Sequence, residues 1–320
     1  MAAYVLRRVL WGLVLLLLVS LLTFVVFYVL PSADPAQLRA GRNASPETLR
    51  QIRDSLGLNR PVTAQYWTFL TQLVFHGSLG YSYYSQASVG SLLLDRLPAT
   101  LSLTVGAVVI WIAVALPLGV VSAVRRGTWI DKLTTGGALI GISAPVYWLG
   151  LVALYLFADD IGKWPLLPGA GSYVGLTADP WGWFTSLILP WLVLASTFCA
   201  VYARLLRGNM IETMSEDYVR TAEAKGLSRR RVVWRHALRG AVTPLVTLAG
   251  LDVGLLLGGA VLTETVFDIP GIGRLNYDAI THADYPLIQG TVLLAACFVI
   301  VANIAVDVAY AYLDPRVRTA

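Results

Sequence analysis

The sequence predicts an all-α membrane protein with six transmembrane helices. Its 320 residues are 57% hydrophobic and only 13% charged, whereas an average soluble protein carries about 25% charged residues. With a mean hydropathy of +0.67, much of the surface must face lipid. A polar island, residues 216–239, lies between two of the apolar runs and organises the rest of the chain.

Six apolar runs are long enough to cross a bilayer, which takes about 20 residues. The first, Val9–Leu30, follows two arginines. A cleaved signal peptide is the alternative for this run, but the run exceeds the usual apolar length of about 7 to 15 residues and lacks a small-x-small cleavage site. The other runs, in which Pro117, Pro145 and Pro190 are expected to be tolerated as kinks, are Ala99–Val124, Leu133–Ala158, Trp183–Leu206, Ala241–Thr265 and Leu287–Tyr312.

Lys and Arg in short loops predict the orientation, because they accumulate on the cytoplasmic side. Basic residues fill one set of loops and the C-terminal tail: Arg125, Arg126, Lys132, nine residues from Arg204 to Arg239, Arg316 and Arg318. The opposite loops hold only Lys163 and Arg274, apart from the long first loop, whose six arginines carry little weight. Both termini are therefore expected in the cytoplasm, and the net charge of +5 does not indicate nucleic acid.

This topology divides the chain into four parts: residues 1–30 as the first span, 31–98 as a small extracytoplasmic domain, 99–312 as a five-helix core with a cytoplasmic loop at 207–240, and 313–320 as a cytoplasmic tail. Within the extracytoplasmic part, Ser45-Pro46-Glu47 predicts the start of a helix and Gly57 its end. Leu49, Ile52 and Leu56 form its apolar stripe.

The polar island predicts two short helices. Thr213 and Glu216 have capping-box spacing and Gly226 suits a C-terminal cap, which indicates a helix over about 215–225. A second amphipathic run, Ser228–Leu238, begins with three arginines and suits a helix that lies on an anionic membrane surface. The island could be a loop that only fixes topology, or a helix that docks in a cleft on a soluble partner.

The island also resembles a known motif. The resemblance is to the EAA loop of ABC importer permeases. It is carried by Arg220-Thr221-Ala222, then three intervening residues and Gly226, then nine intervening residues and His236-Ala237-Leu238-Arg239. The run YVRTAEAKGLSRRRVVWRHAL is similar to the dipeptide, oligopeptide and nickel branch. Further blocks of the same branch are Leu30-Pro31, Asp34-Pro35-Ala36, Gly77-Ser78-Leu79-Gly80, Ser143-Ala144-Pro145, Thr263-Glu264-Thr265 and Tyr310 to Arg316.

The resemblance implies the type I ABC importer permease fold in a cell inner membrane. It implies a second, related permease subunit, two cytoplasmic ATPase subunits that bind ATP and Mg, and an external binding protein that delivers a di- or oligopeptide. The residues implied to couple to an ATPase are Glu216, Asp217, Tyr218, Arg220, Thr221, Ala222, Lys225 and Gly226. This chain itself would hold no cofactor or metal and no catalytic residue.

Small and polar residues inside the spans are the other candidates. Gly250, Gly254 and Gly258 form a strip for close helix packing, either within the bundle or across a subunit interface. Intramembrane polar groups often line pathways. The pathway candidates are Asp252, Glu264, Tyr147 and Asn303. Asp252 could instead be a satisfied structural partner and Glu264 a solvated helix end, and solvation is expected for Asp307 near the end of the last span.

The sequence lacks the motifs that several other classes of protein require. The sequence has no phosphate-binding Gly-x-x-x-x-Gly-Lys-Ser/Thr loop, and its three histidines are scattered. Cys199 and Cys297 both lie in apolar runs and are expected to be reduced thiols. The open alternatives are import of nickel or glutathione by the same machinery, a self-contained secondary transporter, or an intramembrane enzyme.

Overall fold

The computed structural model describes residues 2–30, 34–40, 45–55 and 57–313, and this part of the chain contains helices but no β-strand. The predictions for Pro31, Leu56 and the tail, including Arg316 and Arg318, lie outside the described residues. The helices are α1 Ala2–Phe24 with the π-helix η1 Val25–Val29, α2 Pro35–Ala40, α3 Pro46–Ser55, α4 Val62–His76, α5 Val89–Val124, α6 Trp129–Ser143, α7 Val146–Phe157, α8 Pro180–Thr213, α9 Asp217–Ala224, α10 Arg229–Arg231, η2 Val232–Ala237, α11 Leu238–Leu257, α12 Val261–Val266, α13 Ile272–Thr281 and α14 Tyr285–Leu313.

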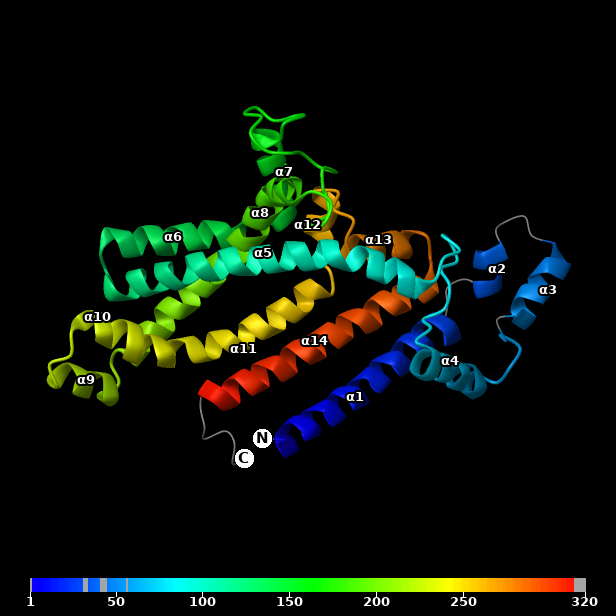
Figure 1. The fold of residues 1–320 in the computed structure, drawn as a ribbon, viewed down its shortest axis with the longest axis horizontal. Helices are drawn as coiled ribbons and strands as arrows, with labels where there is room; N and C mark the ends of the chain where they lie inside the picture. Colours follow the sequence, from blue (N-terminus) through cyan, green and yellow to red (C-terminus); the bar gives the residue numbers. More distant parts are fainter. Residues whose placement is uncertain (1, 31–33, 41–44, 56, 314–320) are drawn as a thin grey trace.

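Among the described residues, five helical segments are long and apolar enough to cross a membrane: Leu6–Val29, Val89–Val124, Pro180–Thr213, Arg229–Leu257 and Tyr285–Val308. A sixth span results if α6 and α7 are counted together. In Figure 1, α5, α11, α14 and α1 follow one another in successive layers, and α8 runs at an angle across α5 toward the start of α11. The contacts agree, because α8 packs on α5, α6 and α11, while α14 packs on α11 and α1.

The predicted third span is not a kinked helix but two helices. α6 and α7 meet at an angle of 100°, and α7 turns away from the bundle in Figure 1. Ala144 has an extended backbone, as is usual for a residue that precedes proline. Pro145 then acts as the N-cap of α7, so this proline separates two helices, whereas Pro117 and Pro190 lie inside continuous ones.

Two other predicted boundaries were wrong. α5 begins at Val89, ten residues before the expected start at Ala99, and it contains Pro98 within its helix. The fifth span was expected over 241–265, but its helical segment runs from Arg229 to Leu257. Two residues after its end, the chain turns at Gly259, whose φ of +124° is a conformation that only glycine adopts readily. The separate helix α12 follows.

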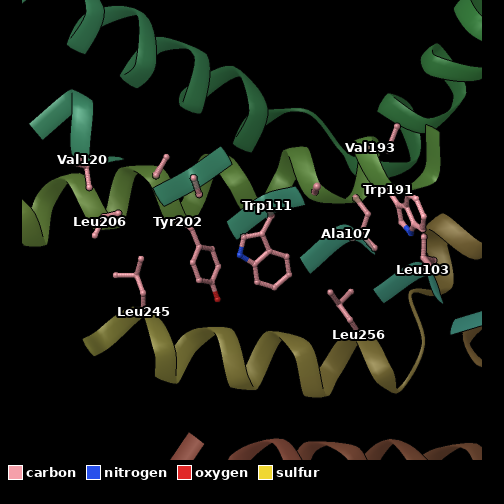
Figure 2. Close-up of a cluster of buried hydrophobic side chains, with 14 of the residues drawn as sticks. Leu103, Ala107, Trp111, Val120, Trp191, Val193, Tyr202, Leu206, Leu245 and Leu256 are labelled. Carbon is pink, nitrogen blue, oxygen red and sulfur yellow. The ribbon is translucent and has the colours of Figure 1, made fainter. Parts of the chain in front are cut away.

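The α5–α8 pair forms the centre of the core. Gly106 allows the Trp191 ring to lie directly against the α5 backbone, since a Cβ at this glycine would come within 2.1 Å of the ring. Trp191 also donates a hydrogen bond of 2.9 Å from Nε1 to the Ser102 carbonyl. Figure 2 shows Trp191 beside Leu103 and Ala107, and Trp111 beside Tyr202, in the layer between α5, α8 and α11.

The glycine strip of α11 packs inside this chain. A Cβ at Gly250 would lie 1.9 Å from Val306, one at Gly254 would lie 2.9 Å from the Val299 Cα, and one at Gly258 would lie 2.7 Å from Ala295. All three contacts are with α14. Of the two expected roles, the strip therefore serves packing within the bundle.

Candidate functional site

The helix expected to couple to an ATPase is α9, which lies at the end of the bundle opposite α2, α3 and α4 (Figure 1). Val219 and Ala222 are buried against the segment that follows α9. Gly226, with φ of +77°, reverses the chain after the helix as predicted. The other predicted coupling residues are exposed: Glu216, Asp217, Tyr218, Arg220, Thr221, Lys225 and Gly226.

Three details of the island differ from the predictions. Thr213 is the last residue of α8, and the N-cap residue Glu216 makes no side-chain capping hydrogen bond, so there is no capping box. Ala222 faces the protein interior and is unavailable to a partner. The run Ser228–Leu238 is not a separate surface helix, because α10, η2 and α11 continue into one another as a single 29-residue helix.

Tyr218 connects α9 to the start of this long helix. Its side chain is half-exposed, and its hydroxyl lies over Gly240, where a Cβ would approach it to 2.7 Å. Partial burial, followed by the nearby Glu216 charge, raises the pKa of Tyr218 above its ordinary value. The phenol is therefore neutral at physiological pH, and it can act as a hydrogen-bond donor at the exposed surface of the island.

An ion pair that the sequence analysis missed joins α6 to α8 near the island. Arg207 donates two hydrogen bonds to the Asp131 carboxylate, at 2.5 and 2.8 Å. The same carboxylate accepts hydrogen bonds from the Ser122 hydroxyl at 2.6 Å and the Gly127 amide at 2.8 Å. The Asp131–Arg207 clamp thus fixes the α5–α6 turn to α8. The sequence offered one indication of this ion pair, because Asp131 is an acidic residue in a loop whose other charged residues are basic.

Asp252 forms a satisfied hydrogen bond in the interior of the bundle. The Tyr202 hydroxyl on α8 donates to Asp252 on α11 at 2.5 Å, and Figure 2 shows Tyr202 projecting toward α11 beside Trp111. Trp111 stacks on Phe198 and packs against Tyr202 with its ring tilted by 41°. Its buried Nε1 atom has no hydrogen-bond partner among the described residues. The structural role expected as one alternative for Asp252 is therefore present.

Glu264 is neither at a solvated helix end nor open to a pathway in this structure. Its side chain is completely buried, accepting a hydrogen bond of 2.9 Å from the Thr100 hydroxyl and others from the backbone amides of Ala260 and Arg274. Thr100 in turn accepts a hydrogen bond from the Ile272 amide. Glu264 therefore joins α12 and α13 to α5.

The other two pathway candidates, Tyr147 and Asn303, form no hydrogen bond with Asp252 or Glu264 in the described part of the chain. Tyr147 is half-exposed on α7, and Asn303 is partly exposed on α14. No hydrogen bond joins any two of the four candidates within the part of the chain that the structure describes. Asp307, expected to be solvated, instead forms an ion pair of 3.0 Å with Arg8 and so fixes α1 to α14.

Two family models match this chain and together cover nearly all of it. Residues 115–319 match the family described as binding-protein-dependent transport system inner membrane component. Residues 1–104 match the corresponding N-terminal family. The chain belongs to this family. It is thus a multi-pass permease subunit of the binding-protein-dependent ABC importers, which work with a substrate-binding protein and ATPases.

Full-length relatives agree with this family. A peptide transport system permease protein of Brucella abortus (strain 2308) is 42% identical over 318 residues, which is 99% of both chains. The dipeptide transport system permease protein DppB of Escherichia coli (strain K12) is 39% identical over 343 residues, again 99% of both chains. DppB of Alkalihalophilus pseudofirmus is 36% identical over 334 residues, covering 99% of this permease and all of the relative.

Proposed function

We propose that this permease imports di- or oligopeptides, which an external binding protein delivers. The support is the set of relatives along the whole chain, whose names specify peptide or dipeptide transport. The alternatives, which are import of nickel or glutathione and a secondary transporter, have no such support. In the proposed complex, two cytoplasmic ATPase subunits bind ATP and Mg, and a second homologous permease supplies the other half of the pathway.

The proposed topology has six spans, with α6 and α7 together as the third, and both termini in the cytoplasm. It rests on the basic residues around α9, of which Arg229, Arg230 and Arg231 are exposed. In this orientation α2, α3 and α4 belong to the extracytoplasmic side. The proposed role of this chain is translocation without catalysis.

The exposed surface of α9 is proposed to seat in a cleft on an ATPase. Arg220 and Glu223 face solvent, while Val219 and Ala222 anchor the helix on this chain. Movement of an ATPase would thus reach the long helix through the α9 anchor. Asp252, Tyr147 and Asn303 are proposed to contact the pathway, whereas the buried position of Glu264 supports a structural role.

The test is a double charge reversal on the exposed side of α9, Arg220→Glu with Glu223→Lys, which leaves the buried anchor intact. A matched control is Arg50→Glu on the exposed surface of α3. In proteoliposomes with the ATPases and the binding protein, we expect the double variant to insert normally and to lose ATP-dependent dipeptide uptake, while the control retains it. Normal uptake by the double variant, with its ATPases still attached, would refute the coupling role.

A further inference from the structure

α4 is an uncharged helix in a segment that was expected to be a polar external domain. Its 15 residues, Val62–His76, contain no Asp, Glu, Lys or Arg. Pro61 precedes the helix, and Gly77, with φ of +59°, ends it. A short helix without charged residues, too short to span a bilayer, is typical of a buried or an interfacial segment rather than of a water-exposed one.

The contacts of α4 place it at the depth of the first span. The Tyr66 hydroxyl lies 3.0 Å from the Ser20 hydroxyl, and the Tyr66 ring packs on Phe24 with centroids 5.2 Å apart. The apolar span continues to Val29, so Ser20 lies about 14 Å inside its end at 1.5 Å per residue. A hydrocarbon core about 30 Å thick would therefore include part of the α4 contact.

α4 has two different sides. Gln65, Thr68, Gln72 and His76 recur at helical spacing and line one side of a 550 Å³ cavity, together with Arg39 and Asp54 from α2 and α3. Trp67 and Val74, which are 68% and 66% exposed, lie on another side of the helix, and Phe75, which is 78% exposed, lies at the edge between the two sides. The polar side therefore faces a cavity with polar and charged lining residues, and the apolar side is left exposed by the part of the chain that the structure describes.

Next to the α4 contact, the surface of α1 is also apolar and exposed. Leu17, whose carbonyl accepts a hydrogen bond of 3.4 Å from the Tyr66 hydroxyl, is 49% exposed, and Leu22, on another face of α1, is exposed as well. Both lie within an apolar span, where lipid is the expected neighbour. α1 packs on α14, and α14 packs on α11, so α4 lies at the periphery of the helix bundle (Figure 1). Trp is enriched where a helix meets the lipid headgroups.

We propose that α4 is an interfacial helix that binds the membrane. Trp67, Val74 and Phe75 lie among the acyl chains of the leaflet in which the first span ends, and Gln65 and Gln72 face the cavity. The occupant of this surface is phospholipid. The segment between the first two spans is thus anchored in the bilayer and is not a freely solvated domain.

Spin labels at single cysteines can test this placement in the assembled transporter, in vesicles of phosphatidylethanolamine and phosphatidylglycerol. The two native cysteines, Cys199 and Cys297, are first replaced by serine. Labels at Trp67→Cys and Val74→Cys report the apolar side. Leu22→Cys is the lipid control, and Glu47→Cys, on the exposed surface of α3, is the water control. Collision with oxygen and with chromium oxalate is measured for each label by electron paramagnetic resonance.

We expect both α4 labels to match Leu22→Cys, with frequent collisions with oxygen and few with chromium oxalate. A match to Glu47→Cys would overturn the proposal, because the side would then face water. Protection from both reagents would also overturn it, since a protein partner would then cover the surface. The measurement is then repeated with and without the binding protein. Protection that appears only in its presence identifies the binding protein as the partner, and protection that is already present without it identifies a subunit of the transporter. A Gln72→Cys label, on the cavity side, should be more accessible to chromium oxalate than either apolar-side label.

Discussion

The Tyr202 hydroxyl lies 2.5 Å from a carboxylate oxygen of Asp252, and this hydrogen bond joins α8 to α11 inside the bundle. Because α8 leads into α9 and α11 continues the segment that follows it, the bond connects the two helices that flank the island. A fully buried acceptor that loses its donor costs about 1–3 kcal/mol, and we expect a smaller cost here because Asp252 is only partly buried.

Two single variants separate the structural role of this pair from a pathway role. Tyr202→Phe removes the donor, and we expect it to lower the melting temperature of the purified transporter. Asp252→Asn keeps an acceptor for Tyr202 but removes the charge, so we expect stability to change little and dipeptide uptake to fall. Thermal unfolding and uptake are measured on both variants. Unchanged uptake in Asp252→Asn would leave the carboxylate a purely structural partner.

The Asp131–Arg207 clamp should be important for stability. Asp131→Ala leaves Arg207, which is about three-quarters buried, without its carboxylate, and breaking a buried pair costs about 3–5 kcal/mol. The exposed part of Arg207 moderates this figure. We therefore expect a lower melting temperature and weaker coupling of ATP hydrolysis to transport. Lys132→Ala, on the neighbouring exposed side chain, is the control, and an equal effect of both changes would contradict the role of the clamp.

The α11–α14 contact should be intolerant of added volume. In Gly254→Ala, the new methyl group would lie 2.9 Å from the Val299 Cα, which is backbone and cannot rotate away. We expect a destabilisation of about 1–3 kcal/mol, as for other overpacked sites. Gly137→Ala on α6 meets no atom within 4 Å and should leave the melting temperature unchanged. Similar melting curves for the two variants would show that α14 shifts at little cost.

Glu264 should hold α12 and α13 in place. Glu264→Gln keeps the size of the side chain, but its amide group would point a donor at one of the backbone amides that now donate to the carboxylate. An unpaired buried donor costs about 1–3 kcal/mol. We expect faster trypsin cleavage after Arg274 on α13, while cleavage in the α9–α10 region stays at the wild-type rate. An unchanged cleavage pattern would show that other contacts suffice.

Local patterns predicted that apolar spans, α3 and α9 exist, because apolar length and helix-ending glycines are encoded within a few residues, but they did not predict the bounds of α5 or of the long helix that ends at Leu257. Ser45, for example, caps α3 through a hydrogen bond to the Thr48 amide, as its position suggested. The glycine spacing likewise predicted a close helix contact. The sequence did not show which helix packs against these glycines, since Val306 of α14 lies 56 positions from Gly250.

The missed features depend on distant partners. Asp131 and Arg207 are 76 positions apart, and Glu264 is buried by residues from α5 and α13. The bend at Pro145 was misjudged because an apolar run has the same composition whether proline kinks it or divides it. The polar residues 228–238 suggested a surface helix, and only the packed structure shows that they continue into α11.

The uninterrupted segment from Arg229 to Leu257 gives the permease a lever. Twenty-nine residues at 1.5 Å per residue make a rod about 44 Å long. If the end near α9 is the pivot, a tilt of about 10° displaces the far end by roughly 7–8 Å. Gly258 and Gly259 lie at that far end, where the rod stops and α12 begins. Under the proposed coupling, a small rotation on one side of the membrane would therefore produce a larger displacement at the opposite end of this helix.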